Sequence, residues 1–436
     1  MEYKEKFVED TKERINENDF IIVCRISERD FTRKRKVMPT DIINYELNKK
    51  GLISKMKIRK FNKISDVDGI SSSGMFQQRE KLNPDAFKVL TNMNLKTFYH
   101  EYKKDVKTVN GYVVKAVDGS DFEVPNTKIA RKLYNGKLQD QCARVTVSTG
   151  YDVLNKYTLD TVVKEYNHSE IDMFLEHEKT ITDNNLLGDF KSITTADRNY
   201  KNLSLFYNYI KKDIKFVFRI SASVYKNEIC QMKSNDEIIE IGYEYNRLKY
   251  YKESDPELYE YLKNENKIEV RCVKIVLDTG EVEYLLTNLS KDEFTYDQIN
   301  ELYRLRWKIE VNYKHLKNNL KIECITSGKM QLIKQDIYSQ ILVANILQAF
   351  INDSDENIEQ DKYKHKHKTN NNMAIGIFKD DFINILLEDD ASKRSRMTSI
   401  LMDEIRKYTL PEIPDRKNPR KNNPKNRYNI NQRKSF

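Results

Sequence analysis

A stripe of charged and aromatic side chains runs through residues 302–320, a segment that lacks Gly and Pro and has apolar residues at helical spacing. On a helical wheel of roughly 100° per residue with Tyr303 at zero, Arg306, Glu310 and Lys317 fall at roughly 300°, 340° and 320°. A carboxylate beside two cations suits a metal ion next to phosphate, because the carboxylate binds a hard cation while Arg and Lys hold anionic oxygens. The pattern predicts one helix that carries part of a site.

The remaining positions of this segment divide into an apolar face and a solvent face. Arg304, Lys308 and His315 point away from the stripe, and we expect them in solvent. A solvated basic amphipathic helix is the ordinary interpretation, but it does not ask for a carboxylate, two cations and a phenol lined up beside the core. The residues that fall together at roughly 200–260° and form the apolar face are Leu302, Leu305, Ile309, Leu316 and Leu320.

Two-metal phosphoryl transfer needs carboxylates besides Glu310, so we looked for aspartates at the ends of strands. Asp118 follows the strand-like run 112–117 and precedes a Gly, which predicts a strand tip. Asp197 follows the apolar segment 190–196 in the same way. Either aspartate alone is more commonly a turn or helix cap. Together with Glu310 they predict a carboxylate triad.

Composition bounds the class of protein. The chain has 436 residues, 33% of them charged, with 12 Gly and 8 Pro, which favours an ordered, helix-rich protein. The net charge of +9 has two concentrations, residues 33–36 and the tail 416–436, and either binds nucleic acid or is a solvated basic segment. The five cysteines form no Cys-x2-Cys pair, so neither a zinc site nor a disulfide framework is indicated. With no signal peptide and no apolar run of membrane length, we expect a cytoplasmic protein without a membrane partner.

The order of elements predicts an α/β protein in several parts. Residues 1–105 are expected to be helical, with a helix start at Pro39. The run 71–73 of three Ser residues offers an N-cap for a helix from Met75 to Leu82, whose Arg79 and Lys81 could face a phosphate backbone. A DNA-binding domain and a plain helical packing domain are nearly equal alternatives there. Strands are expected at 112–117, 143–148, 157–163, 190–196 and 216–220, a helix at 169–178, further strands at 268–277 and 282–288, a buried helix at 331–351, and one or two short helices at 378–401.

The residues Tyr303-x2-Arg306-x3-Glu310-x6-Lys317 resemble the signature of the insertion-sequence-four family of bacterial DDE transposases, at all four positions. Asp118 in Val-Asp-Gly-Ser and Asp197 in Ala-Asp-Arg-Asn-Tyr resemble the first and second catalytic aspartates of that family, in the right order. The likeness covers roughly residues 30–436 and is weakest in the N-terminal hundred.

This resemblance implies a ribonuclease H-like core (106–221 and 296–352) interrupted by a β-rich insertion (222–295), with a helical N-terminal DNA-binding domain (1–105) and a C-terminal helical region with a basic tail (353–436). It implies that Asp118, Asp197 and Glu310 hold two Mg²⁺ ions, for which Mn²⁺ can substitute, and that the enzyme cuts and rejoins DNA. Tyr303, Arg306 and Lys317 would contact phosphates near the scissile bond.

The resemblance also implies partners: the terminal inverted repeats of the element, target DNA, and a second copy in a homodimeric synaptic complex, associated with the nucleoid. Arg219 is a further candidate phosphate contact, although pairing with a surface acid is the commoner role of such an Arg. Relatives that cleave through a DNA hairpin stack a flipped base on a tryptophan of the insertion. The only tryptophan here, Trp307, falls beside the reactive stripe at roughly 40° instead and is a further candidate DNA contact.

Two other functions stay open on the sequence alone. One is a transposase-derived DNA-binding protein without activity, against which the intact triad argues. The other is a metal-dependent nuclease of repair or recombination, which would use the same core but has no need of the stripe from Tyr303 to Lys317. Strand transfer is the property that separates them.

Overall fold

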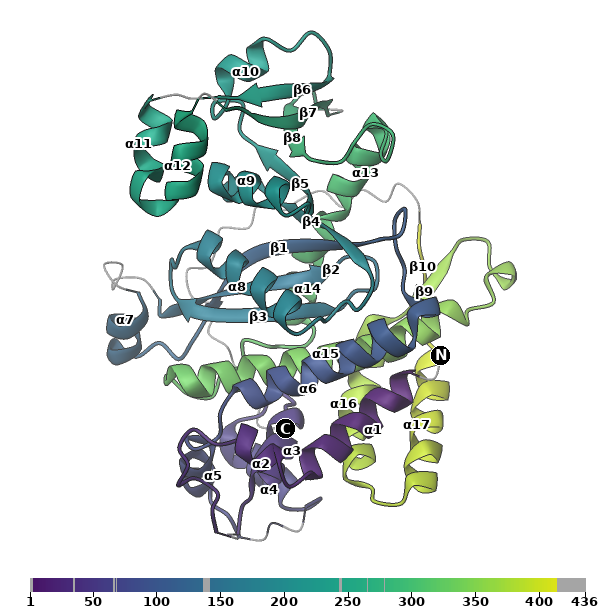
Figure 1. Ribbon diagram of the computed structural model, residues 1–436. Helices are drawn as coiled ribbons and strands as arrows, with labels where there is room; N and C mark the ends of the chain where they lie inside the picture. The colour runs from purple at the N-terminus through teal and green to yellow at the C-terminus, as the bar shows by residue number, and fades with distance from the viewer. Residues whose placement is uncertain are drawn as a thin grey trace.

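A mixed β-sheet forms the centre of the molecule (Figure 1). The computed structural model describes residues 3–413, apart from 34–35, 66, 68, 136–141, 243–244, 265 and 278. In this part of the chain eight strands pair in the order β3-β2-β1-β4-β5-β8-β7-β6. They are β1 (Tyr112–Glu123), β2 (Arg144–Asp152), β3 (Thr158–Glu165), β4 (Lys191–Ala196), β5 (Lys215–Ile220), β6 (Asp236–Ile241), β7 (Ile268–Val276) and β8 (Val282–Thr287).

Strand direction changes along the sheet. β1, β2 and β3 form an antiparallel meander, whereas β4 is parallel to β1 and β5 is parallel to β4. α8 (Glu170–Asp183) supplies the crossover between β3 and β4, as a parallel connection requires. β8 returns antiparallel to β5, so the strands between 222 and 295 extend the central sheet. The strands expected from the sequence are all present, and β6 in a charged stretch is additional.

The two faces of the sheet are covered by different helices, and β5 makes this clear through its alternation. Phe216 and Phe218 pack with Phe206 of α9 (Leu203–Lys211), in the core cluster that also contains residues of α8. Val217 belongs to the other cluster, with Ile299 of α13 (Tyr296–Leu305). The segment 222–295 also contains three helices that the sequence did not reveal, α10 (Lys226–Cys230), α11 (Tyr245–Ser254) and α12 (Pro256–Lys263).

The expected single helix over 302–320 is two helices. α13 ends at Leu305 and α14 (Trp307–Asn318) begins two residues later. At the junction the amide of Arg306 bonds to the carbonyl of Tyr303 (3.0 Å) and the amide of Ile309 to the carbonyl of Arg306 (3.0 Å). These i→i+3 bonds tighten the chain at the junction, a change of local geometry that apolar periodicity does not register.

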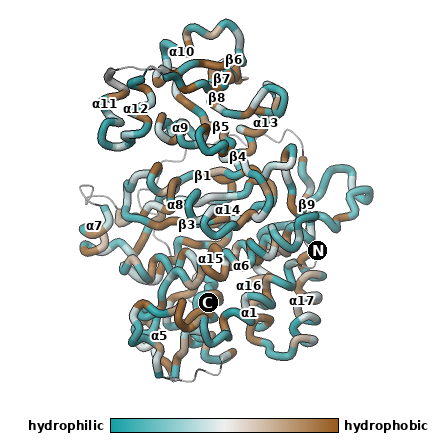
Figure 2. The backbone as a smooth tube through the Cα atoms, in the orientation of Figure 1, coloured by the Kyte–Doolittle hydropathy of each residue, from teal (hydrophilic) through white to brown (hydrophobic). Residues whose placement is uncertain are grey.

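The expected buried helix is α15 (Met330–Glu356), which packs against β3 of the sheet and against the helices α1, α3, α6, α16 and α17. In Figure 1 it runs side by side with α6 across the molecule, and α6 is one of its main packing partners. In Figure 2 brown hydrophobic segments recur along the strands, while the protruding loop before β9 is hydrophilic. No helix in the described ranges is long and apolar enough to cross a membrane.

The other helices are α1 (Tyr3–Asn16), α2 (Phe20–Val23), α3 (Pro39–Leu47), α4 (Ser54–Phe61), α5 (Ser72–Arg79), α6 (Asp85–Lys96), α7 (Lys128–Tyr134), α16 (Asn371–Leu387) and α17 (Ala391–Arg406). Short helical segments are η1 (Thr97–Glu101), η2 (Lys103–Asp105), η3 (Arg198–Tyr200) and η4 (Gln360–Lys362). A separate strand pair is formed by β9 (His367–Thr369) and β10 (Thr409–Pro411).

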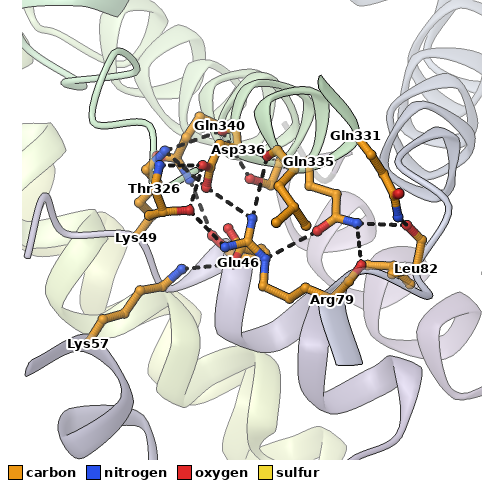
Figure 3. A network of polar contacts seen from close by, with 12 residues as sticks. Glu46, Lys49, Lys57, Arg79, Leu82, Thr326, Gln331, Gln335, Asp336 and Gln340 are labelled. Atoms are coloured by element: carbon orange, nitrogen blue, oxygen red, sulfur yellow. Dashed lines mark hydrogen bonds and ion pairs between the residues drawn. The ribbon is translucent and has the colours of Figure 1, made fainter. Parts of the chain in front are cut away.

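Arg79 is buried, which corrects the expectation that it faces a phosphate backbone. Its guanidinium is 3.0 Å from Glu46 of α3 and 3.3 Å from Asp336 of α15 (Figure 3). Lys57 of α4 pairs with the same Glu46 at 3.1 Å, and Lys49 lies 3.5 Å from Asp336. The N-cap at Ser71 and the helix start at Pro39 are confirmed. The network ties the N-terminal helices to α15, a pairing between residues far apart in sequence that local pattern cannot reveal.

Two basic segments singled out in the sequence fall partly or wholly outside the described residues. Lys34 and Arg35 of the first cluster and the whole tail 416–436 lie there. All five cysteines are described, and all are free.

Candidate active site

Asp118 lies inside a strand, not at its tip. β1 continues to Glu123 because its pairing with β2 continues from Asp118↔Thr149 to Glu123↔Arg144. On its other side, β1 is paired with β4 only as far as Ala116↔Thr195. Asp118 is therefore two residues past the last pairing with β4, where one edge of β1 is no longer covered by that strand. The Gly that follows it marks a partly exposed point of the strand and not its end.

Asp197 directly follows β4, as the sequence predicts. Its Oδ1 accepts a hydrogen bond from the amide of Asn199 (2.8 Å), so it caps the single turn η3. Because β1 and β4 are parallel neighbours, the chain leaves β4 beside Asp118. The two aspartates interact electrostatically across this gap.

Glu310 lies in the first turn of α14, which packs against β1. Its Oε1 accepts a hydrogen bond from Nη2 of Arg306 at 2.9 Å. Arg306 is itself buried at the α13–α14 junction, and its Nε has no hydrogen-bond partner among the described residues. The junction thus presents a cation and a carboxylate together, and both interact electrostatically with Asp118.

Among the three carboxylates of the expected triad, Asp118 has a clearly shifted pKa. Burial, followed by the charge of Asp197, raises the pKa of Asp118 to about 7, against the opposing effect of Arg306. Within the described residues, no three His, Cys, Asp or Glu side chains stand close enough together to hold a metal ion as they are. Asp118 nevertheless interacts electrostatically with both Asp197 and Glu310, and Glu310 forms an ion pair with Arg306.

The other residues of the expected site lie at varying distances from this group. Tyr303 is buried, with the Arg306 guanidinium 5.6 Å from its ring centroid. Arg219 pairs with Glu283 of β8 at 2.9 Å. Trp307 is half exposed, at 49%. Lys317, near the end of α14, reaches β1 three residues beyond Asp118, where its Nζ donates to the carbonyl of Asp121.

The wheel identified the buried face of the segment correctly but not all of its solvent face. Leu302, Ile309, Leu316 and Leu320 are buried and Arg304 is exposed, as expected, whereas Leu305 of the same face is only half-buried. Lys308 and His315 are only partly exposed, and burial lowers the pKa of both. Their expected place in solvent is wrong, because neighbouring elements also cover that side of α14.

Tyr313 was missed, although it falls at roughly 280° on the same wheel, between the apolar face and the stripe. It is buried, and its hydroxyl lies 2.8 Å from the carbonyl of Asp118 and 3.1 Å from that of Val147. The hydroxyl also accepts a hydrogen bond from Thr149 at 3.0 Å. Tyr313 therefore holds the backbone of Asp118 and its partner strand against α14.

A chain of buried polar groups supports Asp118 from below, and no sequence signal indicated it. Ser148 donates to the carbonyl of Asp118 at 3.2 Å, and its Oγ lies 2.9 Å from Nε2 of His177. Nδ1 of His177 lies 2.7 Å from Asp160, which also pairs with Lys88 of α6 at 2.7 Å. Ser148 is fully buried, so this Ser-His-Asp order has no access to a substrate. Its role is to position β1.

Comparison with known proteins decides the family. Residues 110–346, more than half of the chain, match the model of the transposase DDE domain, and this range contains Asp118, Asp197 and Glu310. The chain belongs to the transposase DDE domain family.

Similar sequences and structures extend this family assignment only over short or distant matches. A putative transposase of Escherichia coli for insertion sequence element IS186A is 33% identical over 94 residues, 21% of this chain and 25% of that protein. The transposase of Clostridium perfringens for element IS1151 is 33% identical over 75 residues, 17% of this chain and 16% of that protein. This DDE-domain chain therefore aligns with at most about a quarter of these relatives. One solved chain comes from a piggyBac transposase synaptic complex with hairpin DNA. The match covers 93% of the present chain and 85% of the solved chain, at a TM-score of 0.42 and 8% sequence identity, a likeness too distant to assign a fold or a role.

Proposed function

We propose that this chain is the transposase of an insertion sequence of the insertion-sequence-four type. It binds the terminal inverted repeats of its element and moves the element by strand cleavage followed by strand transfer. The observation that carries the proposal is the electrostatic convergence of Asp118, Asp197 and Glu310, from two strands and one helix far apart in sequence, inside the matched family range.

The order and direction of the strands support a ribonuclease H-like core. The first five strands lie in the order 3-2-1-4-5, with β1–β3 antiparallel and β4 and β5 parallel to β1. This arrangement is the one expected of that core, and it brings the end of β4 next to the middle of β1. The boundaries of the core, the insertion and the flanking domains remain those expected from the sequence.

The donor set fits a hard divalent cation, because carboxylate oxygens are the ligands that Mg²⁺ prefers. Asp118, Asp197 and Glu310 would hold the metal, and Mn²⁺ would substitute for Mg²⁺. When bound, two such ions supply an activated water or 3′-hydroxyl and stabilise the leaving oxygen. Arg306 donates to Glu310, and its guanidinium would be available to a phosphate if Glu310 turned to a metal ion.

The remaining cationic and aromatic residues position DNA. We infer that Tyr303 and Arg306 contact a phosphate at the scissile bond, and that Lys317 contacts one further along β1. Arg219 would have to leave Glu283 to reach a phosphate, and Trp307 offers an exposed ring. Two copies of the chain would pair two element ends, each site cutting one end.

The test is Mn²⁺- or Mg²⁺-dependent cleavage of a labelled duplex that carries the element's own end. We expect the intact protein to cut at the end, and Glu310→Gln to reduce the rate by at least about a hundredfold, since even outer partners of a metal ligand are worth about 10–100-fold. Glu301→Gln, which changes an exposed glutamate of α13, is the matched control and should cleave normally.

The same assay separates the alternatives. Binding without cleavage by both proteins would replace this proposal with that of an inactive DNA-binding derivative. Cleavage without joining of the cut end to a second duplex would indicate a nuclease instead.

A further inference from the structure

A fourth carboxylate, Glu170, stands at the edge of the candidate site. It occupies the first turn of α8, whose N-cap Ser169 accepts a hydrogen bond from the amide of Asp172 at 3.3 Å. α8 packs over β1, β2, β3 and η3. This packing carries the Glu170 side chain to Gly119, where an added Cβ would lie 3.6 Å from Oε1. This is an ordinary van der Waals distance, so the Glu170 carboxylate lies beside the residue that follows Asp118.

Asn199 lies between Glu170 and Asp197. Its backbone amide donates to Oδ1 of Asp197 at 2.8 Å, and its side chain opposes the rise that burial causes in the pKa of Glu170. The two carboxylates are close enough for Asp197 to raise the pKa of Glu170, after the larger effect of burial. The two acids form a local concentration of negative charge. Among the described residues, no Lys, Arg or His forms an ion pair with Glu170.

Two polar atoms at this point are buried without a hydrogen-bond partner among the described residues. One is Oε2 of Glu170 itself. The other is the hydroxyl of Tyr200, a fully buried side chain that follows Asp197 by three residues and interacts electrostatically with Glu170, Asp118 and Asp197. Buried polar atoms are nearly always satisfied, so these two atoms call for a further partner at this point, such as a water or a cation.

We propose that Glu170 is a fourth carboxylate ligand of the divalent metal site, binding the same cation as Asp197. The inference rests on the proposed function, because it presumes that Asp118 and Asp197 hold metal. A Glu side chain has three rotatable bonds, and in this role the Glu170 carboxylate would turn towards the ion. The Tyr200 hydroxyl then has a partner in the metal-bound carboxylate or in a water on the cation.

The ordinary alternative is that Glu170 only stabilises α8, since an acid in the first turn interacts favourably with the helix dipole. Asp172 offers a matched control, because it is an acid of the same turn and is exposed. A helix-dipole role predicts that Glu170→Gln and Asp172→Asn behave alike. A ligand role predicts that only Glu170→Gln changes metal binding.

The experiment is calorimetric titration of the full chain with Mn²⁺ alone, for the intact protein, Glu170→Gln, Asp172→Asn and Asp118→Asn. We expect Glu170→Gln to weaken Mn²⁺ binding by about tenfold or more, and Asp172→Asn to leave it unchanged. If Glu170→Gln binds Mn²⁺ normally and Asp118→Asn does not, the inference on Glu170 is overturned and the proposed metal site is upheld. Absence of binding by the intact protein would overturn both.

A second readout follows the coordination shell directly. The luminescence lifetime of bound Tb³⁺ in H₂O and D₂O gives the number of water ligands, and replacing one oxygen ligand should raise it by about one in Glu170→Gln. If Glu170→Gln folds poorly, Glu170→Asp takes its place. Glu170→Asp keeps the charge with a shorter reach, so we expect its Mn²⁺ affinity to lie between those of the intact protein and Glu170→Gln. An unchanged number of waters in both Glu170 variants would contradict the inference.

Discussion

Asp118 combines burial with a like-charged neighbour, and this has a measurable cost in the metal-free protein. Its folded pKa of about 7 lies above the ordinary value of 3.8. Between these two pH values the folded chain keeps a proton that the unfolded chain has released. The free energy of unfolding therefore falls as pH rises through this window and levels off above about 7.

Asp118→Asn removes this titration. We expect the variant to be more stable than the intact protein at pH 8 by about 1–4 kcal/mol, with the difference closing towards pH 4. Urea unfolding with EDTA present, at a series of pH values, measures it. Parallel curves for the two proteins would contradict the assignment, and Asp172→Asn serves as a control on an exposed acid.

The phenol of Tyr313 is the second residue whose effect can be isolated. Tyr313→Phe removes a hydroxyl that contacts the carbonyls of Asp118 and Val147 and leaves those buried groups with one partner fewer. We expect a loss of about 1–3 kcal/mol in the free energy of unfolding. Tyr250→Phe, at an exposed tyrosine, should unfold at the same urea concentration as the intact protein, and an equal midpoint for Tyr313→Phe would show that its hydroxyl bonds carry no net weight.

At the scale of elements, α15 is the helix on which the N-terminal helices are fixed. Burial would raise the pKa of Asp336, but Lys49 and Arg79 outweigh it and hold that pKa below its ordinary range. A depressed carboxylate pKa contributes stability above about pH 4, and the contribution is lost as pH falls further. The contact between α5 and α15 is thus expected to be acid-sensitive.

Asp336→Asn tests this contact at neutral pH. Removing this partner leaves Lys49 buried without its counter-charge and leaves Arg79 with Glu46 alone, so we expect a loss of about 3–5 kcal/mol. Asp380→Asn is the control, because the Lys50–Asp380 pair is exposed on the Asp380 side (77%) and should be worth less than about 1 kcal/mol. Equal losses for the two variants would mean that the buried network does not couple these helices.

At the scale of the whole molecule, basic charge supplies a sequence-independent attraction for DNA. The tail 416–436 carries eight Lys or Arg and no acid. Deleting it should weaken binding to any duplex and flatten the dependence of affinity on salt, because fewer counterions are released. Fluorescence anisotropy at several salt concentrations measures the slope. A tail with its residues scrambled keeps the charge and should restore binding, whereas an unchanged slope after deletion would assign the tail no contact with phosphate.

Sequence pattern was sufficient where one local signal decides the structure. Alternating and continuous apolar runs predicted the strands from β1 to β8 apart from β6. The triad of carboxylates, predicted from strand ends and one helical stripe, stays a prediction. The break between the two helices at Arg306 was not predicted, because the apolar spacing continues across it. The C-terminal end of β1 was predicted too early, because Gly119 suggested an end whereas pairing with β2 continues to Glu123.

What the sequence by itself determined is the succession of strands along the chain and the buried face of α14, and it predicted a set of reactive residues, because each depends on spacing along the chain. Only the tertiary structure decided which residues meet. Arg79 was assigned to DNA on its charge, yet acids from α3 and α15 lie around it, and Glu170 gave no signal until α8 folded over Gly119. Contacts of this kind join positions up to hundreds of residues apart, and a local pattern holds no record of the partner that will neutralise or desolvate a charge.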